Sequence, residues 1–544
     1  MFATSYLVIF KKIVIRLLIY FTNHAHFMAL TPRDKDFSAR YNELVEQADL
    51  AQHSSVRWCM VIKPYGYAIW ENMQKILDFM FKQTWHQNAY FPLLIPKSYF
   101  TKEAKHVDGF ATEAAIVTHY RLKRDEASNE IIVDPEAKLE EELIIRPTSE
   151  TIIWNTYKDW IKSYRDLPLL INQWANVMRR EMRTRLFLRT SEFLWQEGHT
   201  AHATAEDALD ETKRMRTVYQ EFFEKVLAIS GAVGEKSENE RFAGAENTFT
   251  IECMMQDGKA LQACTSHFLG QNFGKAFDVT FANKNNEQEH ARATSWWAST
   301  RMIGWLIMAH SDDKGLVLPP MIAPIHVVIV PIWKTDEEKI KVSDYITSIT
   351  DKLTFKNPDR RFGRYMTFEV EWKKMQYETD LVCKVDRDDQ KTMGWKMKQY
   401  ELQWVPLRIV IGPRDIEKWS LMIERRDQAE KVEISGGESC LHQVWEHLYD
   451  MQHKLTENYK LFMSRKIKTT DTRDDFVQLL DEWNFVLAHR DGTAETEKKI
   501  KELCKATIRC IPYDNKRYKR PSSPGNCVLT GKPSSRRVLF AIAY

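Results

Sequence analysis

The sequence lacks three features that would each define a class of protein. The apolar stretch at the start is broken by Lys11, Lys12 and Arg16, so it does not make the uncharged run of about 20 residues that a membrane-spanning helix needs. Neither charge sign dominates: 78 Lys and Arg stand against 75 Asp and Glu, so any nucleic-acid binding must come from local basic patches. The eight cysteines are scattered, which argues against a disulfide scaffold and favours the reducing cytoplasm.

The first 27 residues need a separate interpretation. A signal peptide carries its charges before its apolar run, whereas here the cations interrupt it. Met28 opens the segment Met-Ala-Leu-Thr-Pro-Arg-Asp, which begins like a soluble protein. We therefore expect translation to start at Met28 and residues 1–27 to be an extension of the gene model. An organellar targeting peptide is the alternative.

The remaining chain has the composition of a folded multidomain protein. Hydrophobic residues make up 44% and charged residues 28% of 544 positions, a length that predicts three or four domains of roughly 100–200 residues. Up to Leu316-Val-Leu-Pro-Pro320, helical and strand-like patterns are interspersed without a βαβ rhythm or a glycine-rich nucleotide loop, which predicts an α+β domain. Strands separated by helices then predict a compact α/β unit, followed by a helical stretch and a third α/β-like region. The elements expected with the clearest periodicity are helices at 67–82, 149–164, 205–228 and 295–308 and strands at 170–178 and 248–252.

The densest group of chemically active side chains lies between Asn176 and His199. Two strands joined by a charged loop would place five of these side chains along one antiparallel pair: Arg179, Glu181, Arg189, Phe193 and Glu197. An arginine followed two residues later by a carboxylate can hold a phosphate and an amino group side by side. An exposed, salt-bridged hairpin is the alternative for Arg-x-Glu alone.

Three further blocks accompany this group. Arg146-Pro-Thr148-Ser-Glu150 is also a plausible helix start with an acidic first turn. His267 lies in a polar run within an apolar context, where a hydrogen-bonded structural histidine is the default. Arg301 is embedded in an apolar segment, and a buried arginine needs an anionic partner from the protein or a ligand.

In this order, the blocks resemble the class II aminoacyl-tRNA synthetases. The helix into Tyr90-Phe-Pro92 resembles motif 1, the segment from Arg179 to Glu197 motif 2, and Arg301 the arginine of motif 3. The amino-acid sequences of the blocks resemble those of the prolyl-tRNA synthetase family of the eukaryote/archaeal-like type. The quoted blocks are Arg146-Pro-Thr-Ser-Glu-Thr, Phe187-Leu-Arg-Thr, Glu192-Phe-Leu-Trp-Gln-Glu-Gly-His, Thr265-Ser-His, Met393-Gly-Trp-Lys, Val405-Pro-Leu-Arg and Gly412-Pro-Arg-Asp, with the final Ala543-Tyr544.

The resemblance implies a fold and a division into domains. We expect an antiparallel-sheet catalytic domain over residues 28–318, an α/β anticodon-binding domain over 319–437 and a small α/β C-terminal domain over 438–544. In some relatives that last domain binds zinc through four cysteines. Here Cys504, Cys510 and Cys527 are present, but Thr530 stands where a fourth might be expected, so we expect no zinc.

The resemblance also implies the reaction and the residues that carry it. Proline's carboxylate would attack the α-phosphorus of ATP, bound with Mg²⁺, and prolyl-adenylate would then pass proline to the 3′-terminal adenosine of tRNA(Pro). Arg179 and Arg301 would be the catalytic residues. The proline-binding residues would be Thr148, Glu150, Arg179, Trp195, Glu197, His199 and His267. The ATP-binding residues would be Arg179, Glu181, Arg189, Thr190, Phe193, Gln262, Thr265 and Arg301.

The sequence departs from the family pattern in three places. Trp297 stands where the family usually has glycine, and Gln403-Trp404 replaces a Lys-Gly pair. Between His199 and Phe249 too few residues remain for the editing insertion of bacterial-type enzymes. Because a pocket rejects a smaller competitor by only about 1–3 kcal/mol per methylene, a separate trans-editing protein is a possible partner.

Two other functions compete with this interpretation. A synthetase for threonine or serine would keep the class but change the pocket, and Glu150 and His267 in their prolyl-type blocks argue against it. A regulatory or RNA-binding relative without catalysis would have lost Arg179, Glu181 or Arg301, and all three are present. Motif 1 implies a homodimer, and we expect no membrane association.

Overall fold

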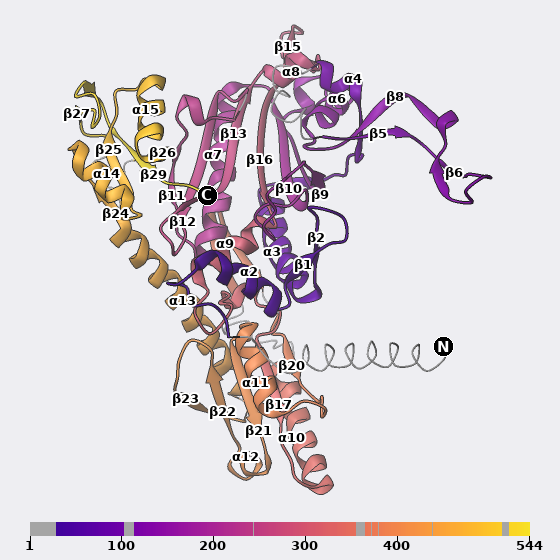
Figure 1. Ribbon diagram of the computed structural model, residues 1–544, viewed down its shortest axis with the longest axis vertical. Helices are drawn as coiled ribbons and strands as arrows, with labels where there is room; N and C mark the ends of the chain where they lie inside the picture. The colour runs from indigo at the N-terminus through magenta and orange to yellow at the C-terminus, as the bar shows by residue number, and fades with distance from the viewer. Residues whose placement is uncertain are drawn as a thin grey trace, which may run out of the picture.

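The computed structural model describes residues 29–102, 114–242, 244–354, 365–370, 373–378, 380–437, 439–513 and 522–544 (Figure 1). The segment 1–27, for which an extension or a targeting peptide was expected, lies outside these residues. Two lobes dominate the views: a large one built around a long sheet, and a smaller α/β lobe below it in Figure 1. Among the helices that the structure describes, none is both long and apolar enough to cross a membrane.

An eleven-stranded sheet forms the core of the large lobe. Its six middle strands, β11-β12-β13-β16-β10-β9, pair antiparallel throughout. The full order is β24 (Ile467–Thr469), β25 (Phe485–His489), β29 (Arg537–Ala541), β26 (Thr507–Pro512), β11 (Ala232–Glu235), β12 (Asn247–Met254), β13 (Ala260–Gly270), β16 (Arg292–Ser299), β10 (Glu192–His202), β9 (Leu169–Met178) and β3 (Gln87–Asn88).

One face of this sheet is packed and apolar. Helices α3 (Pro64–Gln83) and α7 (Ala205–Glu221) cover it, and Phe81 of α3 contacts the ring of Trp296 at 6.4 Å between centroids. The neighbouring strand carries Gly198 opposite Trp296, and a Cβ atom there would lie 2.0 Å from the indole ring. Glycine is therefore required at this position, and the other face of the sheet is left for polar side chains.

Most of the expected elements are confirmed, but the helix expected at 295–308 is wrong at its start. Residues up to Ser299 form strand β16, and the helix α9 begins only at Arg301 and ends at His310. Thr294, Trp296 and Trp297 are residue types that fit a pleated, half-buried surface. The boundary at Thr300 places Arg301 at the first turn of α9, directly beside the open face of the sheet.

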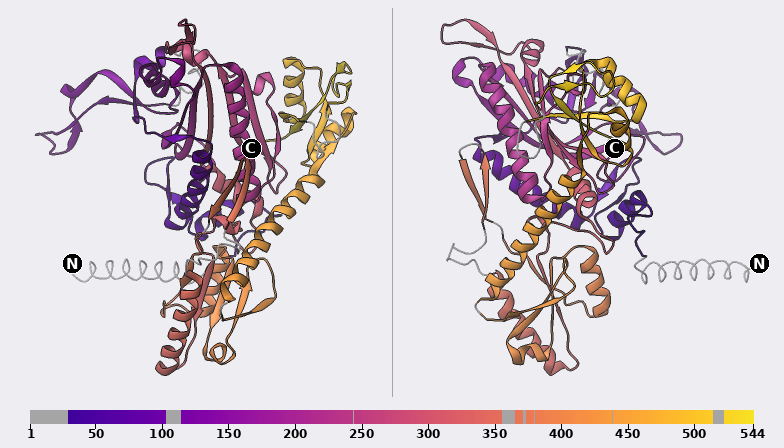
Figure 2. Two further views of the ribbon diagram at one scale, coloured as in Figure 1. Left: turned by 180° about the vertical axis from the view of Figure 1, so that it is seen from behind. Right: turned by 90° about the vertical axis from the view of Figure 1, so that its left-hand side faces the viewer.

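Smaller elements surround the catalytic sheet. The N-terminal segment contains α2 (Phe37–Gln47) and the pair β1 (Ala51–His53) and β2 (Met60–Ile62). An arm extends away from the body (Figures 1 and 2). The arm and the elements around it are β4 (Leu94–Pro96), α4 (Lys97–Lys102), β5 (Ala115–His119), β6 (Leu122–Arg124), β7 (Ile131–Val133), β8 (Lys138–Ile145), α6 (Glu150–Trp160), α8 (Asn272–Ala276), β14 (Thr280–Ala282) and β15 (Gln288–His290).

The second lobe has the expected α/β architecture. Its five-stranded sheet has the order β20-β17-β21-β22-β23, in which β17 pairs parallel with both of its neighbours. The elements are β17 (Val327–Pro331), α10 (Asp336–Thr354), β20 (Cys383–Val385), α11 (Met393–Leu402), β21 (Leu407–Ile411), α12 (Pro413–Lys418), β22 (Ser420–Arg425) and β23 (Lys431–Ser435). The strands β18 (Tyr365–Val370) and β19 (Lys373–Glu378) form a separate antiparallel pair that packs against α7 and α3 of the large lobe.

The C-terminal region is joined to the catalytic domain by backbone hydrogen bonds between two strands. The long helix α13 (Cys440–Lys466) leads from the second lobe to a small unit with α14 (Arg473–Asp481), α15 (Ala494–Cys504), β27 (Gly525–Asn526) and β28 (Pro533–Ser534) (Figure 1). Strand β26 of this unit pairs with β11, at Gly234↔Pro512 and Glu235↔Ile511. The catalytic sheet therefore continues into the C-terminal region without a break.

A buried ionic group fastens this junction. Glu252 on β12 is fully buried and accepts hydrogen bonds from Lys236 at 2.7 Å and from Arg509 of β26 at 2.8 and 3.0 Å. Burial alone would raise the pKa of Glu252, but the charges of Arg509 and Lys236 hold it below its usual value. Removing one partner of such a group leaves buried charge without compensation, which is strongly destabilising.

Glu252→Gln is therefore expected to lower the free energy of unfolding by about 3 kcal/mol near neutral pH. Because the folded-state pKa of Glu252 is depressed, its contribution is present above its unfolded pKa of about 4.3 and is lost as the pH falls through the folded value. The difference between wild type and Glu252→Gln should therefore shrink in acid. Denaturant titrations at several pH values measure this, with the exposed pair Lys97–Glu142, through Lys97→Met, as the control. Equal stability of Glu252→Gln and wild type would contradict the role of the group.

Candidate active site

The open face of the catalytic sheet collects polar and aromatic side chains from four neighbouring strands. Antiparallel pairing sets Glu197 of β10 opposite Gln173 of β9 and Trp297 of β16, and Trp297 opposite Thr265 of β13. Two residues further along β10, His199 pairs with Ser295 of β16, and Ser295 pairs in turn with His267 of β13. Because side chains alternate between faces, these rows share the face that Trp296 does not occupy.

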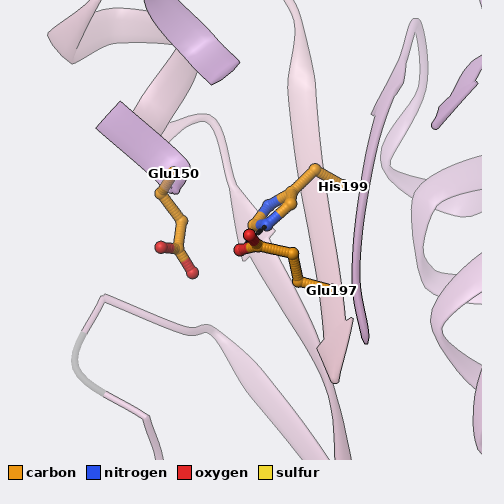
Figure 3. Close-up of side chains that lie close together, drawn as sticks. All are labelled: Glu150, Glu197 and His199. Carbon is orange, nitrogen blue, oxygen red and sulfur yellow. Dashed lines mark hydrogen bonds and ion pairs between the residues drawn. The ribbon is translucent and has the colours of Figure 1, made fainter. Parts of the chain in front are cut away.

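Two carboxylates and a histidine form the centre of this face (Figure 3). Potential ligand atoms of Glu150, Glu197 and His199 all lie within 4.8 Å of one another, and all three residues are buried. His199 Nε2 is 3.1 Å from Glu197 Oε2. Burial would lower the pKa of His199, but the hydrogen bond to Glu197 and the charges of Glu150 and Glu197 raise it above its usual value.

The two carboxylates are oriented by hydroxyl and amide groups. Thr148 donates to Glu150, and Ser149 donates to Glu197 Oε1, which also accepts from Gln173 Nε2 at 2.9 Å. Glu150 is the first residue of α6, so the expected helix start with an acidic first turn is confirmed. The same short segment thus begins a helix and supplies a carboxylate to the site.

His267 occupies the side of the face formed by β12 and β13. Its two ring nitrogens lie 2.9 Å from Thr265 Oγ1 and 3.0 Å from Thr248 Oγ1, and its ring packs on Phe242 with centroids 4.8 Å apart. Burial and the nearby charges of His199 and Lys236 lower its pKa to about 3. His267 is therefore a neutral, fixed hydrogen-bonding group, whereas His199 holds its proton more strongly.

Aromatic rings and Arg179 form the next part of the face. Arg179 Nε donates to the carbonyl of Pro147 at 2.8 Å, and its guanidinium lies 5.6 Å from the ring centroid of Phe193 and 5.3 Å from that of Trp195. The ring of Trp297 packs on Trp195 with centroids 6.2 Å apart. The indole of Trp297, at the position where the family usually has glycine, therefore faces the site.

Three arginines converge beside this aromatic group. Burial, followed by the positive charges of Arg179 and Arg189, lowers the pKa of Arg301 to about 10, while Glu181 acts in the opposite direction. Arg301 Nε donates to the carbonyl of Leu188 at 3.1 Å. Arg179 and Arg301 are partly buried and Arg189 is exposed, and cations that repel one another at such short range favour the binding of an anion. The group therefore suits a polyanion such as a triphosphate.

The geometry corrects the expected position of the motif 2 residues. Strand β9 ends at Met178 and β10 begins at Glu192, so Arg179, Glu181 and Arg189 lie in the connecting loop and not on the ladder. Of the five side chains expected along the pair, Phe193 and Glu197 belong to β10.

Two other ATP candidates lie near the site with different surroundings. Thr190 is buried in the same loop, and its hydroxyl donates to the carbonyl of Glu192 at 2.8 Å. Gln262 lies on β13, three residues before Thr265 and beyond a β-bulge in the pairing with β12. Its side chain is only partly buried.

Three residues with clear roles in the site were not among the candidates. Ser149 and Gln173 both hydrogen-bond to Glu197, and the pairing of β9 with β10 is what brings Gln173 there. The fully buried Arg146 donates to the carbonyls of Phe91 and Asn176, each at 2.8 Å. Only Ser149 adjoins a predicted site residue in the sequence; Gln173 could be found only from the strand register.

The cysteines of the C-terminal region do not form a metal-binding cluster within the described residues. Cys504, Cys510 and Cys527 are buried, and in the described part of the chain they do not gather with other metal-binding side chains. Glu150, Glu197 and His199 are the set of three that comes together there. The expected absence of zinc stays a prediction.

Three family models match successive parts of the chain. The class II core domain of tRNA synthetases (G, H, P, S and T) matches residues 132–310. An anticodon-binding domain matches residues 326–439, and the C-terminal domain of prolyl-tRNA synthetase matches residues 473–544. These matches follow the three regions of the fold in order.

Named relatives cover almost the whole chain. The proline–tRNA ligase of Bacteroides fragilis is 56% identical over 517 residues, 95% of this chain and 99% of the relative, and that of Porphyromonas gingivalis is 53% identical over 515 residues with the same coverage. The crystal structure of prolyl-tRNA synthetase from Cryptosporidium parvum, complexed with halofuginone and AMPPNP, is 33% identical with a TM-score of 0.82. That match covers 95% of this chain and 98% of the other. The chain therefore belongs to the prolyl-tRNA synthetase family of class II, and its reaction is the ligation of proline to tRNA(Pro).

Proposed function

We propose that the carboxylate–histidine group and the arginine group bind the two small substrates side by side. Proline would occupy the space at Thr148, Glu150, Trp195, Glu197, His199 and His267, and ATP, as its Mg²⁺ complex, the space at Glu181, Arg189, Thr190, Phe193, Gln262, Thr265 and Arg301. Arg179, between the two sets, would contact both. The observation that carries this proposal is the separation of charge: two buried carboxylates lie at one end of the face and three arginines at the other.

The charge of the first group matches an imino acid. The raised pKa of His199 favours its protonated form. When His199 carries that proton, Glu150, Glu197 and His199 together have one net negative charge. A single secondary ammonium neutralises that charge, whereas an isolated buried carboxylate would be costly. The ring of Trp195 supplies a flat apolar wall for the carbons of proline.

The second group would lower the barrier of adenylate formation by position and charge. The carboxylate oxygen of proline attacks the α-phosphorus, the bond to the bridging oxygen breaks, and pyrophosphate leaves with the electron pair. Negative charge is spread over the phosphoryl oxygens in such a transition state. Arg179 would hold the proline carboxylate against the α-phosphate, and Arg301 and Arg189 would stabilise the phosphate oxygens.

The remaining assignments concern assembly and cellular context. We infer a homodimer formed through the helix α3 and the Tyr90–Pro92 segment, a cytoplasmic location, and a separate trans-editing protein that removes alanine from mischarged tRNA. We also infer domain limits of 28–318, 319–437 and 438–544, with residues 1–27 as an extension or targeting segment. These follow from the family resemblance and from the boundary at Leu316–Pro320.

Arg179→Ala is expected to lower the rate of proline-dependent ATP–pyrophosphate exchange by about 10²–10³, the effect of removing one preorganised charged donor. The neighbouring Arg180 is exposed, so Arg180→Ala is the matched control and should keep wild-type exchange. Wild-type protein should exchange best with proline among the twenty amino acids. Similar losses in the two variants would contradict the phosphate role of Arg179.

His199 is expected to titrate above its usual pKa of about 6.5 in the wild type and at a lower pH in Glu197→Gln, because the hydrogen bond and charge of Glu197 are then lost while the charge of Glu150 remains. The stabilisation from this raised pKa is fully present below the unfolded value and is lost as the pH rises through the folded value. NMR of ¹³C-labelled histidine measures both forms. His267, with a pKa of about 3, should remain neutral throughout and serves as the internal control. An unchanged pKa of His199 in Glu197→Gln would show that Glu197 does not set its charge.

A further inference from the structure

The motif 2 loop is held from outside by the N-terminal segment, an element outside the catalytic motifs. The hydroxyl of Tyr41, on α2, donates to the carbonyl of Leu186 at 2.7 Å. The ring of Tyr41 lies beneath the guanidinium of Arg185, 4.4 Å from its centroid. Tyr41 itself is only 2% exposed, so its ring and hydroxyl have fixed positions.

The same segment supplies two more hydrogen bonds to the loop. The amide of Phe187 donates to the sulfur of Met60 at 3.4 Å, and the amide of Ser191 donates to the carbonyl of Trp58 at 2.9 Å. Residues 185–189 of the loop form a tight turn around Phe187, closed by hydrogen bonds in both directions between the backbones of Arg185 and Arg189.

The opposite side of the turn rests on α9. Arg301 donates to the carbonyl of Leu188, and the side chain of Leu188 packs where Gly304 leaves room. A Cβ atom at Gly304 would lie 2.4 Å from Leu188 and 3.0 Å from the Tyr41 hydroxyl. The turn that carries Arg189 is thus clamped between α2 and α9.

We propose that Tyr41 is a positioning residue for ATP: through the carbonyl of Leu186 it fixes the turn that presents Arg189 to the phosphates. The proposal rests on the ATP assignment of Arg189 made above. Tyr41 does not touch the reacting atoms, so its loss should change the fit of ATP and leave the proline end of the site intact.

The test compares Tyr41→Phe with Tyr65→Phe in ATP–pyrophosphate exchange. Tyr65 donates to the carbonyl of Gln403 at 3.0 Å, away from the site, so it is a matched tyrosine–carbonyl pair. Tyr41→Phe should raise KM for ATP by about fivefold to tenfold, the effect of one lost hydrogen bond, with KM for proline unchanged. Tyr65→Phe should leave both constants unchanged at a similar melting temperature.

Two further variants separate the possible failures. Met60→Leu removes the sulfur acceptor of the same turn and should raise KM for ATP in the same direction, which keeps the proposal testable if Tyr41→Phe folds poorly. If Arg189→Ala raises KM for ATP while Tyr41→Phe and Met60→Leu do not, the positioning role is overturned and the ATP site stands. If none of the three changes KM for ATP, both assignments are overturned.

A second inference rests on the backbone of the tryptophans. Five described tryptophans have left-handed backbone conformations, with φ between 49° and 73°: Trp58, Trp85, Trp404, Trp419 and Trp483. A bulky residue rarely adopts this conformation, because its Cβ atom crowds the backbone carbonyl, whereas glycine adopts it readily.

Three of these positions end helices in the way that glycine does. Trp85, Trp404 and Trp483 each follow the C-cap residue of α3, α11 or α14. At each one, the next residue's amide reaches back across the last turn: His86 to Phe81, Val405 to Tyr400, and Asn484 to Leu479, at 2.9–3.1 Å. These are the hydrogen bonds of the Schellman motif, whose left-handed position is usually glycine.

We infer that glycine occupies positions 85, 404 and 483, together with position 297, in the protein as its own cells make it. The two tryptophans noted as departures from the family pattern, Trp297 and Trp404, both stand where the family has glycine. The chain contains 19 glycines and 17 tryptophans, whereas an average usage of about 7% corresponds to about 38 glycines. A codon that those cells read as glycine, and that the standard reading translates as tryptophan, would produce this pattern.

Mass spectrometry of peptides from the protein purified from its own cells tests this inference. Peptides that cover positions 85, 297, 404 and 483 should contain glycine. Trp154, buried within α6, should remain tryptophan and is the internal control. Tryptophan at all of these positions would overturn the inference.

Discussion

The register of β10 between β9 and β16 is the constraint on which the site depends. Because side chains alternate along a strand, a shift of one residue would move Glu197 and His199 to the packed face and expose the neighbouring apolar positions. Trp296 opposes such a shift, since its indole fits only against a glycine on the adjacent strand, and Gly198 occupies that place. Packing on the closed face therefore fixes the positions of the polar groups on the open face.

On the open face, charges of opposite sign are separated into two groups. Carboxylates gather near α6, and arginines gather near the end of β9 and the start of α9. The carboxylates are buried and the arginines are partly buried or exposed, and each group would be complementary to one end of the proposed reacting pair. In the proposed site, proline would bring a cation to the carboxylates and ATP would bring anions to the arginines, so the orientation of both substrates would follow from charge. Preorganised charges of this kind need no rearrangement during the reaction.

The sequence predicted the order of domains and most of the residues that lie together on the open face, since these depend on local patterns and motifs. Helical periodicity predicted α3 and α7, and the resemblance of the motif blocks to the family implied Glu150, Glu197, His199 and His267, which the structure brings to one face of the sheet. The helix expected at 295–308 began too early because a short apolar run fits either a buried strand or a helix. The loop position of Arg179 and the role of Gln173 depend on where strands end and how they pair, and local patterns do not contain that information. The continuation of the sheet through β26 and β11 was missed for the same reason, because backbone hydrogen bonds between distant segments leave no side-chain signal.

In the proposed site, a buried negative group recognises the ammonium of proline. Calorimetric binding of proline and of tetrahydrofuran-2-carboxylate, in the presence of a non-hydrolysable ATP analogue, tests it most directly, because the two ligands share ring size and carboxylate and differ at the ring heteroatom. The oxygen ring should bind at least about 100-fold more weakly, as expected for a buried charge pair that loses one partner. Equal affinity of the two ligands would contradict the account, because recognition would then rest on the carboxylate and the shape of the ring alone.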